Sequence, residues 1–460
     1  MKLQKIFFSA LAFALGALSL VAAEPATKPN IIFILADDLG IGNVSCYGAD
    51  RFKTPNIDAL AATGTRFTHC YATPLCGPSR CLLMTGRYGF HTGMTGNDSG
   101  PLIKPANEVM MPRVLKPAGY VTAQVGKWSQ LPLQPADFGF DEYLRFNGSG
   151  KYWNSQAGNE AYMVNGKSVP LRDGEYLPDL MHHFVVDFLT HHKDQPFYLY
   201  YCMSHIHADI LHTPDSARDS KDLYKDNVVY MDKLVGKLMA ELDRLNLRTN
   251  TLIIFAGDNG LVGGETPAST VNGKVLCGFK GNMQECGSLE PFIASWPGIT
   301  PAGKVLPDLV DFSDFYPTLA DVAGAKLPPG VTLDGRSIVP QLRGQAGKQR
   351  DSIFVELGRQ WFVREKDWKL NQLGELYDMT GAPFKEILVV TNTTDSTAIA
   401  ARTRLQAELD RLNPAGGIVD PGDGSGRHNK EKRDAKKAKK AQAAGKAKVG
   451  KPANKTDANE

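Results

Sequence analysis

The chain has 460 residues, of which 42% are hydrophobic and 22% charged, which is enough for one large domain with a smaller one attached. Seven cysteines in a chain of this length are too few for the dense framework of a disulfide-stabilised scaffold. The formal net charge is +3, but residues 427–460 hold twelve Lys/Arg against four Asp/Glu, so the main body is acidic and no nucleic-acid partner is expected.

The first 23 residues have the pattern of a secretory signal peptide. Lys2 and Lys5 precede an apolar run over residues 6–20, and small residues end the segment at Ala23. The run is too short for a stable membrane span, and no cysteine follows Ala23 to carry a lipid. We therefore expect export, to the periplasm or the medium, without a stable membrane anchor.

A continuous apolar run over residues 30–35 predicts a strand buried on both faces. Asp37 and Asp38 follow it directly. Two adjacent carboxylates are costly there unless they are solvated, cap a helix or bind a cation. Helix capping is a sufficient explanation for either one alone.

The stretch 73–88, TPLCGPSRCLLMTGRY, follows a helix predicted to open at Thr54 and to close at Gly64. Pro78 has the preset φ angle of a first helical position, and Gly86 suits a left-handed helix end. Cys76 is therefore expected at the mouth of a short helix, where amide groups and the positive end of the dipole favour a thiol-derived nucleophile.

Three further buried strands are predicted, over residues 120–125, 196–203 and 251–256, with an amphipathic helix over residues 228–245. Strands separated by helical patterns imply an α/β fold with a mostly parallel sheet flanked by helices. Polar residues follow each apolar run: Lys127 the first, His205 and His207 the second, Asp258 and Asn259 the third.

In an open α/β sheet the ligand crevice lies outside the carboxyl ends of the strands. Asp37, Asp38, Asp258 and Asn259 would meet there and offer only hard oxygen ligands. Such a set suits Ca²⁺ or Mg²⁺ rather than zinc.

The sequence Cys76-Gly77-Pro78-Ser79-Arg80, followed by Thr85-Gly86-Arg87, resembles the signature of the type I sulfatases. In that family the cysteine is oxidised after translation to formylglycine, and the hydrated aldehyde attacks a sulfate ester. The resemblance extends from residue 29 to about residue 379. It implies the alkaline phosphatase-like fold with a small C-terminal antiparallel α+β subdomain.

The resemblance also assigns roles, motif by motif. The implied ligands of one Ca²⁺ per chain are Asp37, Asp38, Asp258, Asn259 and the modified Cys76. The implied groups that bind and cleave the ester are Arg80, Lys127, His207 and Lys280. Of these, Arg80 stabilises the formylglycine and His207 faces the leaving oxygen. Lys280, which forms the motif Lys-Gly-x-x-x-Glu with Glu285, binds the sulfate.

The family comparison implies partners as well. The substrate would be a sulfated glycan or another sulfate ester, and a formylglycine-generating enzyme or an anaerobic maturation enzyme would convert Cys76. Asp258 is the implied acceptor of the proton from the nucleophile, and His207 the implied donor to the departing alcohol.

Two positions depart from the family pattern. Ser129 follows Gly126-Lys127-Trp128 where the family has histidine, which puts rate or substrate class in question. The family motif Glu-Gly-Gly-x-Arg-Val-Pro corresponds here to residues 285–291, which read ECGSLEP. We expect this difference to affect the packing of the loop more than the chemistry of the site.

The sequence alone also allows purely structural roles for the candidate site residues. Lysines are surface residues by default, and a histidine such as His207 is more often a satisfied core residue than a catalytic one. Tyr152, Trp153 and Trp361 are candidates for stacking on sugar rings, although packing is the commoner role.

Two rival functions are a phosphodiester or phosphonate monoester hydrolase of the same fold and a non-catalytic binder of sulfated glycan.

The expected domain organisation follows from these segments. Residues 1–23 form the signal peptide, 24–345 the catalytic domain, 346–415 the C-terminal subdomain, and 416–460 a disordered Lys-rich tail. The tail repeats Lys and Ala, has no aromatic residue and has few branched ones, so a solvated extension is expected, with acidic surfaces or polyanions as conceivable contacts.

Overall fold

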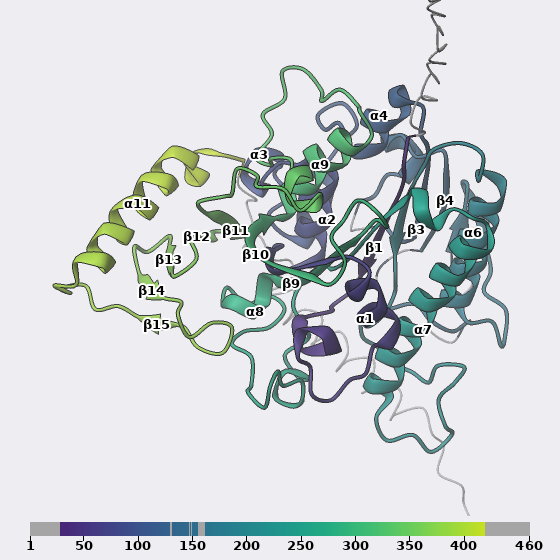
Figure 1. The fold of residues 1–460 in the computed structure, drawn as a ribbon, viewed down its shortest axis with the longest axis horizontal. Helices are drawn as coiled ribbons and strands as arrows, with labels where there is room; N and C mark the ends of the chain where they lie inside the picture. Colours follow the sequence, from purple (N-terminus) through teal and green to yellow (C-terminus); the bar gives the residue numbers. More distant parts are fainter. Residues whose placement is uncertain (1–27, 129–130, 147, 149, 155–161, 419–460) are drawn as a thin grey trace, which may run out of the picture.

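The computed structural model describes residues 28–128, 131–146, 148, 150–154 and 162–418. The predicted signal peptide, Ser129 and residues 419–460 of the predicted tail lie outside the described residues. A ten-stranded sheet with helices on both faces forms the larger part, and a five-stranded sheet with one long helix forms the smaller part at the side of it (Figure 1). Among the described residues, none of the helices has both the length and the apolar composition that crossing a bilayer requires.

The large sheet is mixed, with a parallel centre. Strands β8, β1, β7, β3 and β4 run parallel, β9 is antiparallel to both β2 and β8, and β5 and β6 complete one edge as a hairpin. In spatial order the strands are β10 (Lys304–Asp311), β2 (Thr65–Tyr71), β9 (Leu289–Ser295), β8 (Thr251–Gly257), β1 (Asn30–Ala36), β7 (Phe197–Cys202), β3 (Val121–Lys127), β4 (Glu142–Phe146), β5 (Tyr162–Val164) and β6 (Lys167–Val169).

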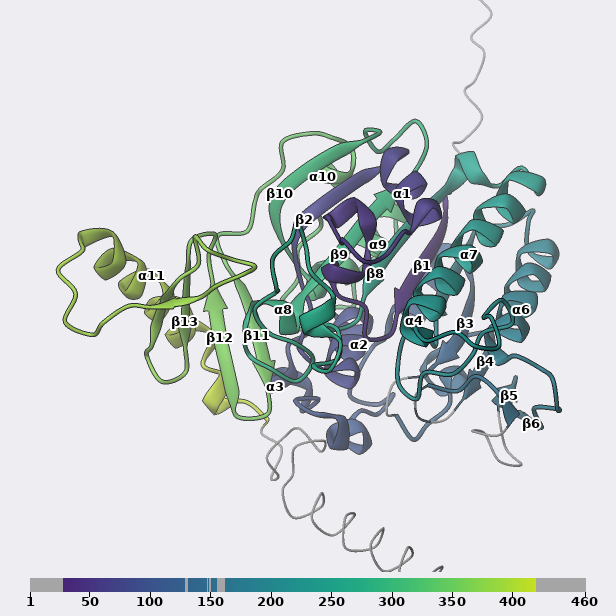
Figure 2. The same ribbon diagram turned by 90° about the horizontal axis from the view of Figure 1, so that it is seen from below.

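Strand β1 lies between two hydrophobic cores, because successive side chains of a strand point to opposite faces. Ile31, Phe33 and Leu35 belong to the core that contains α2 (Cys76–Thr85), α4 (Met111–Leu115) and α9 (Phe315–Val322). Ile32 and Ile34 belong to the other core, with α1 (Pro55–Ala62), α6 (Leu177–His191) and α7 (Leu223–Arg244). Helices α6 and α7 lie side by side over this second face (Figure 2). The apolar run that predicted β1 is thus explained by burial on both sides.

The smaller part is an antiparallel sheet in the order β11 (Ile353–Leu357), β12 (Gln360–Arg364), β13 (Trp368–Asn371), β14 (Leu376–Asp378) and β15 (Ile387–Leu388). Helix α11 (Ser396–Leu412) packs on β12, β13 and β14. Short helices α3 (Gly89–Thr92), α8 (Glu285–Ser288) and α10 (Val339–Leu342) lie in the connections. The predicted α/β class, with a small antiparallel C-terminal sheet, is confirmed.

A buried carboxyl group joins the smaller sheet to helix α3 of the larger part. Glu356 of β11 is 5% exposed, and its Oε2 accepts a hydrogen bond of 2.8 Å from the backbone N–H of Phe90. Burial raises the pKa of Glu356 to about 8, the nearby Asp334 adds to the rise, and the bond from Phe90 opposes it. The neutral carboxyl is therefore the form that suits the fold.

We predict that Glu356→Gln removes a pH-dependent loss of stability. Because the folded pKa lies above the unfolded value, the contribution of Glu356 is complete below about pH 4.5 and is lost as the pH rises through about 8. The melting temperature of the variant, measured relative to that of the wild type at the same pH, should therefore rise by about 2 °C or more between pH 5 and pH 8.5. The half-exposed Glu408→Gln is the control, and a Glu356→Gln offset that stays constant with pH would contradict the prediction.

Candidate active site

The carboxyl ends of β1 and β8 bring four polar side chains together. The Asp258 N–H donates to the carbonyl of Ala36 at 3.0 Å, which continues the pairing of the two strands. The Asp38 N–H then donates to Asp258 Oδ1 at 3.0 Å, and Asn259 Nδ2 donates to Asp38 Oδ1 at 2.9 Å. The side chains of Asp37, Asp38, Asp258 and Asn259 are all buried. Residues more than 200 positions apart thus meet at the predicted edge.

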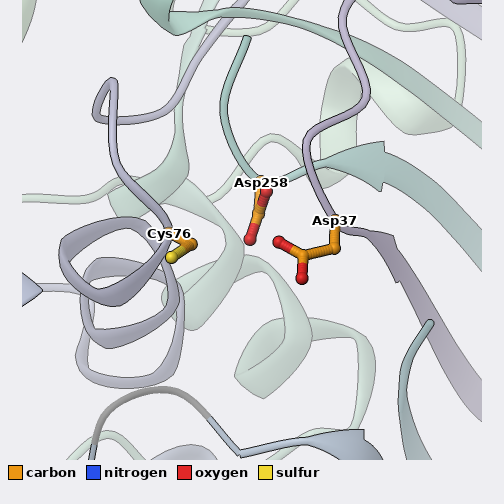
Figure 3. Close-up of side chains that lie close together, drawn as sticks. All are labelled: Asp37, Cys76 and Asp258. Atoms are coloured by element: carbon orange, nitrogen blue, oxygen red, sulfur yellow. The ribbon is translucent and has the colours of Figure 1, made fainter. Parts of the chain in front are cut away.

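Cys76 faces these carboxylates from the first turn of α2 (Figure 3). Its Sγ and one carboxylate oxygen each of Asp37 and Asp258 lie within 4.8 Å of one another. The helix starts two residues earlier than the position of Pro78 suggested, so Cys76 is itself the first helical residue. Gly86 ends the helix with φ +68°, the left-handed conformation expected from the sequence.

Three buried cationic side chains neutralise the carboxylates. Arg80 donates to Asp258 Oδ2 through Nε at 2.9 Å and through a terminal nitrogen at 2.7 Å. Lys127 Nζ lies 2.7 and 2.8 Å from the two oxygens of Asp37. Lys280 Nζ donates to Asp38 Oδ1. Neither lysine is the surface residue that composition alone would suggest, since both are buried.

The pKa values follow from this pairing. Burial alone would raise the pKa of Asp37 and Asp38, but the ammonium groups of Lys127 and Lys280 hold both below the ordinary value. Burial would likewise lower the pKa of Lys127, and the adjacent Asp37 carboxylate raises it instead. Asp37, Asp38 and Lys127 are therefore ionised together in the closed interior.

Gly126 is required for the placement of Lys127. Its φ angle is +100°, and a Cβ added there would lie 1.9 Å from the carbonyl oxygen of Cys202 on the adjacent strand β7. Only glycine permits both the positive φ and this close approach. The end of β3 can therefore turn Lys127 toward Asp37.

His207 and His205 have different environments, although they are two residues apart. His207 Nε2 lies 3.8 Å from Asp38 Oδ2, and its Nδ1 lies 2.5 Å from the carbonyl oxygen of Ala208. A carbonyl can only accept, so Nδ1 carries a proton and Nε2 is the nitrogen that can exchange one at the site. His205 is fully buried against Tyr176, and burial lowers its pKa to about 3. The structural role expected for His205 agrees with this position.

Two buried oxygens at the centre of the cluster accept no hydrogen bond from any described residue. They are Asp38 Oδ2 and Asn259 Oδ1, and each lies in a fully buried side chain. An unpaired polar atom in the interior is costly, so these oxygens point to a further ligand. The donor set of three carboxylates and one amide fits a hard divalent cation such as Ca²⁺.

Asn97, at the start of a short 3-10 helix (Asn97–Leu102), was not predicted from the sequence. Its Oδ1 accepts a 3.0 Å hydrogen bond from the N–H of Gly77, and its Nδ2 lies 3.7 Å from Cys76 Sγ. A Cβ at position 77 would lie 2.5 Å from Asn97 Oδ1, so Gly77 makes room for the amide. Asn97 thereby caps the first turn of α2 and contacts the thiol, and no motif of the sequence marked it.

The divergent segment 285–291 has two buried carboxyl groups. Glu285 forms an ion pair of 2.8 Å with Arg364 of β12 and accepts from the hydroxyl of Tyr71 at 2.7 Å. Glu290 of β9 has neither oxygen paired with a described residue, and burial, reinforced by Asp258 and Asp38, raises its pKa well above the ordinary value. Glu285 thus has the packing role expected of this segment, because it ties the large sheet to the small one.

The three aromatic residues considered for sugar stacking have different exposures. Tyr152 is fully buried and donates to the carbonyl oxygens of Ser204 and His207, so it is a packing residue. Trp153 is partly exposed, and its indole N–H donates to the carbonyl of His212 at 2.7 Å. Trp361 is partly exposed and lines a pocket on the smaller sheet.

Known proteins resemble this chain over most of its length. The family model described as Sulfatase matches residues 29–325. Arylsulfatase A of Homo sapiens is 35% identical over 377 residues, which cover 75% of this chain and 72% of that protein. N-acetylgalactosamine-6-sulfatase of Rattus norvegicus is 33% identical over 365 residues, covering 71% and 68%. The crystal structure of Ps i-CgsB in complex with k-i-k-neocarrahexaose matches with a TM-score of 0.74 and 28% identity, covering 86% of this chain and 96% of that one. The chain therefore belongs to the sulfatase family, whose members are sulfuric ester hydrolases.

Proposed function

We propose that this protein is an exported sulfatase that removes sulfate from a sulfated carbohydrate, with a formylglycine made from Cys76 as its nucleophile and one Ca²⁺ per chain. The observation that carries the proposal is the convergence of Arg80, Lys127 and Lys280 on the carboxylates that face Cys76. A sulfate monoester keeps a negative charge at any physiological pH, and buried cations are what its recognition requires.

The residues that would hold the cation are Asp37, Asp38, Asp258, Asn259 and the modified Cys76. The unpaired Asp38 Oδ2 and Asn259 Oδ1 favour this assignment. When bound, the cation would supply positive charge that polarises the nucleophile and the sulfate oxygens. The hydrate of formylglycine would supply the attacking hydroxyl, after oxidation by one of the two maturation systems that the family uses.

The remaining roles fall to side chains already in position. Asp258 is the proposed proton acceptor from the nucleophile, and the two bonds from Arg80 hold its carboxylate toward Cys76. Lys127 and Lys280 are the proposed donors to the sulfate oxygens. His207 would give a proton from Nε2 to the departing oxygen, while its Nδ1–H stays on the carbonyl of Ala208.

Carbohydrate is the proposed substrate class because two of the similar proteins bear carbohydrate in their names. One is an N-acetylgalactosamine-6-sulfatase, and the other was crystallised with a neocarrahexaose. Export to the periplasm or the medium, inferred from residues 1–23, would give the enzyme access to polymers that do not enter cells.

Two of the rival functions, a two-metal phosphodiesterase and a non-catalytic binder, receive no support from the described residues. A two-metal phosphodiesterase needs a second group of histidine and aspartate ligands. Among the described residues, the candidate metal-binding groups are Asp37 with Cys76 and Asp258, and Asp37 with Asp38 and His207, and both share Asp37. A non-catalytic binder would not need Cys76 beside Asp258.

The proposal is tested by assaying the matured full-length chain on 4-nitrophenyl sulfate, 4-nitrophenyl phosphate, a phenylphosphonate ester and a panel of defined sulfated sugars. Hydrolysis of the aryl sulfate and of at least one sulfated sugar is the expected result. A larger kcat/KM on the phosphonate ester would support the rival hydrolase, and binding of sulfated sugars without any turnover would support the binder.

We also predict that removal of divalent cations lowers the melting temperature as well as the activity. A ligand that binds only the folded state stabilises it by about 2.7 kcal/mol at 100 times its Kd, so added Ca²⁺ should restore the melting temperature in a concentration-dependent way. Asn259→Ala should shift this response to higher Ca²⁺ concentrations, whereas Asp215→Asn, which removes an exposed carboxylate, should not. A melting temperature that ignores both chelator and Ca²⁺ would contradict the assignment.

A further inference from the structure

Two cysteines flank the loop that carries Lys280. Cys277 precedes the lysine by three residues, and Cys286 stands in the divergent segment 285–291, at a position where the family motif has glycine. Cys286 is buried, Cys277 is partly exposed, and both are free thiols in the structure. Neither has a part in the chemistry proposed at Cys76. Cysteine pairs are readily oxidised in the compartments to which proteins are exported, so the relation between these two thiols matters.

The backbones of the two cysteines are joined directly. The N–H of Cys286 donates to the carbonyl of Cys277 at 2.8 Å. Residues that are hydrogen-bonded across two neighbouring chain segments have Cα atoms about 5.5 Å apart. Disulfides form where the Cα atoms are about 4.4–6.8 Å apart. Cys277 and Cys286 therefore meet the first geometric condition for a disulfide.

Both cysteines also contact the same neighbouring segment, residues 383–386. The N–H of Cys277 donates to the carbonyl of Pro383 at 2.8 Å, and the Sγ of Cys286 lies 3.5 Å from that same oxygen. Burial raises the pKa of both thiols, and backbone groups partly oppose it: that of Cys277 acts on Cys286, and that of Glu386 acts on Cys277. The two thiol groups thus lie on the same side of the loop, toward the smaller sheet.

A bond between the two sulfurs would close a loop over residues 277–286 with Lys280 inside it. Lys280 Nζ donates to Asp38 Oδ1 in the catalytic cluster. Gly278 has a φ angle of +100°, and a Cβ added there would lie 2.9 Å from the Cβ of Gln284, so the two arms of the loop are in contact. Joining the ends of the loop covalently would reduce the conformations that are open to Lys280.

We propose that Cys277 and Cys286 form a disulfide in the exported protein, and that this bond fixes the loop that presents Lys280 to the sulfate ester. The inference rests on the proposed function for export and for the role of Lys280. As the S–S bond forms, each thiol gives up one proton and one electron. The two electrons and two protons convert the disulfide of a thiol oxidase or of glutathione to two thiols. The bond forms during folding, before the fold covers Cys286, because a buried thiol of raised pKa reacts slowly.

A peptide map tests the bond itself. The full-length chain is folded in a mixture of glutathione and glutathione disulfide, its free thiols are blocked with iodoacetamide, and it is digested with trypsin without reduction. Trypsin cleaves after Lys280, between the two cysteines, so a disulfide joins peptides 275–280 and 281–304. We expect this joined pair, at a mass two hydrogens below the sum of the two peptides. Separate peptides with alkylated Cys277 and Cys286, or either cysteine joined to a different one, would overturn the proposal.

The effect of the bond on stability is measured with a phosphine reductant. The oxidised wild type should melt about 3 °C above the reduced wild type, because the bond restricts the unfolded chain. The double variant Cys277→Ser/Cys286→Ser should melt like the reduced wild type and should not respond to the reductant. Cys46→Ala, which removes another partly exposed cysteine, is the control and should keep the response. A response that persists in the double variant would overturn the assignment to this pair.

The matured enzyme tests whether the bond positions Lys280. Reduction should raise the KM for 4-nitrophenyl sulfate roughly 3-fold with a smaller change in kcat, because a looser loop must be ordered when the substrate binds. The double variant should have the same KM with and without reductant. An equal KM in the oxidised and reduced wild type would overturn the positioning role. A wild type without any turnover would instead refute the proposed function, and the peptide map would still decide the disulfide.

Discussion

Replacing Cys76 with alanine is expected to reduce turnover of an aryl sulfate by roughly 10⁴- to 10⁶-fold, the range seen when a nucleophile is removed from an otherwise intact site. The reason is positional: the Sγ of Cys76 and one carboxylate oxygen each of Asp37 and Asp258 lie within 4.8 Å of one another. Alanine has no thiol for the maturation enzyme to oxidise, so no aldehyde can form at this position. The fold should remain intact, with a melting temperature near that of the wild type.

Cys81→Ala is the matched control for this variant. Cys81 is a buried cysteine of the same helix, and burial, with a smaller effect of Glu108, raises the pKa of its thiol to about 12, so it remains an unreactive thiol. Its replacement should keep most of the activity. Peptide mass spectrometry of active wild type should show that residue 76 has lost sulfur and gained an aldehyde oxygen. Full activity from protein whose Cys76 is entirely unmodified would refute the role.

The buried centre of the fold was the part most accessible from the sequence. Strands β1, β7 and β8 are continuous apolar runs, because both of their faces are covered, and such runs leave little ambiguity. The polar residues after them could be assigned to one edge because parallel strands end together. The predicted meeting of Asp37, Asp38, Asp258 and Asn259 followed from that topology, and the structure brings them together.

Strands β2 and β9 were not predicted, for a physical reason. Strand β2 reads TRFTHCY, in which Arg66, Thr68 and His69 interrupt the apolar pattern, because this strand is only partly buried. Strand β9 contains the fully buried Glu290, although buried strands usually consist of apolar residues. The helix predicted over residues 228–245 begins earlier, at Leu223, where Asp222 accepts from the N–H of Lys225 as an N-cap.

Residues that act through tertiary contacts left no local signal. Asn97 reaches Gly77 and Cys76 across 20 and 21 positions, and nothing in its own surroundings marks it as a helix cap. Trp361 could be named as a candidate for sugar stacking, but the core against which it packs in the structure could not be predicted from its local sequence. Lys127 and Lys280 required the family's motifs, since composition alone assigns lysine to the surface.

His207 is the residue whose replacement should separate substrates by the quality of their leaving group. We expect His207→Ala to cost roughly 10²- to 10⁴-fold in kcat on a carbohydrate sulfate, the usual range for a general acid, and distinctly less on 4-nitrophenyl sulfate. A nitrophenolate departs almost unaided, whereas a sugar alkoxide needs a proton. The structure gives His207 the geometry for this, because its Nδ1–H is held by the carbonyl of Ala208 and its Nε2 lies 3.8 Å from Asp38 Oδ2 at the catalytic cluster.

The control for this comparison is His212→Ala, five residues further along the same segment. The backbone carbonyl of His212, which this substitution keeps, accepts from the indole N–H of Trp153. That variant should keep its activity on both substrates. Equal losses on the two substrates in His207→Ala would assign the residue to sulfate binding or to structure rather than to proton donation. Because Ser129 stands where the family has a second histidine, a small effect on both substrates would mean that no histidine assists departure here, and the proposed acid would have to be sought among the other groups that face Cys76.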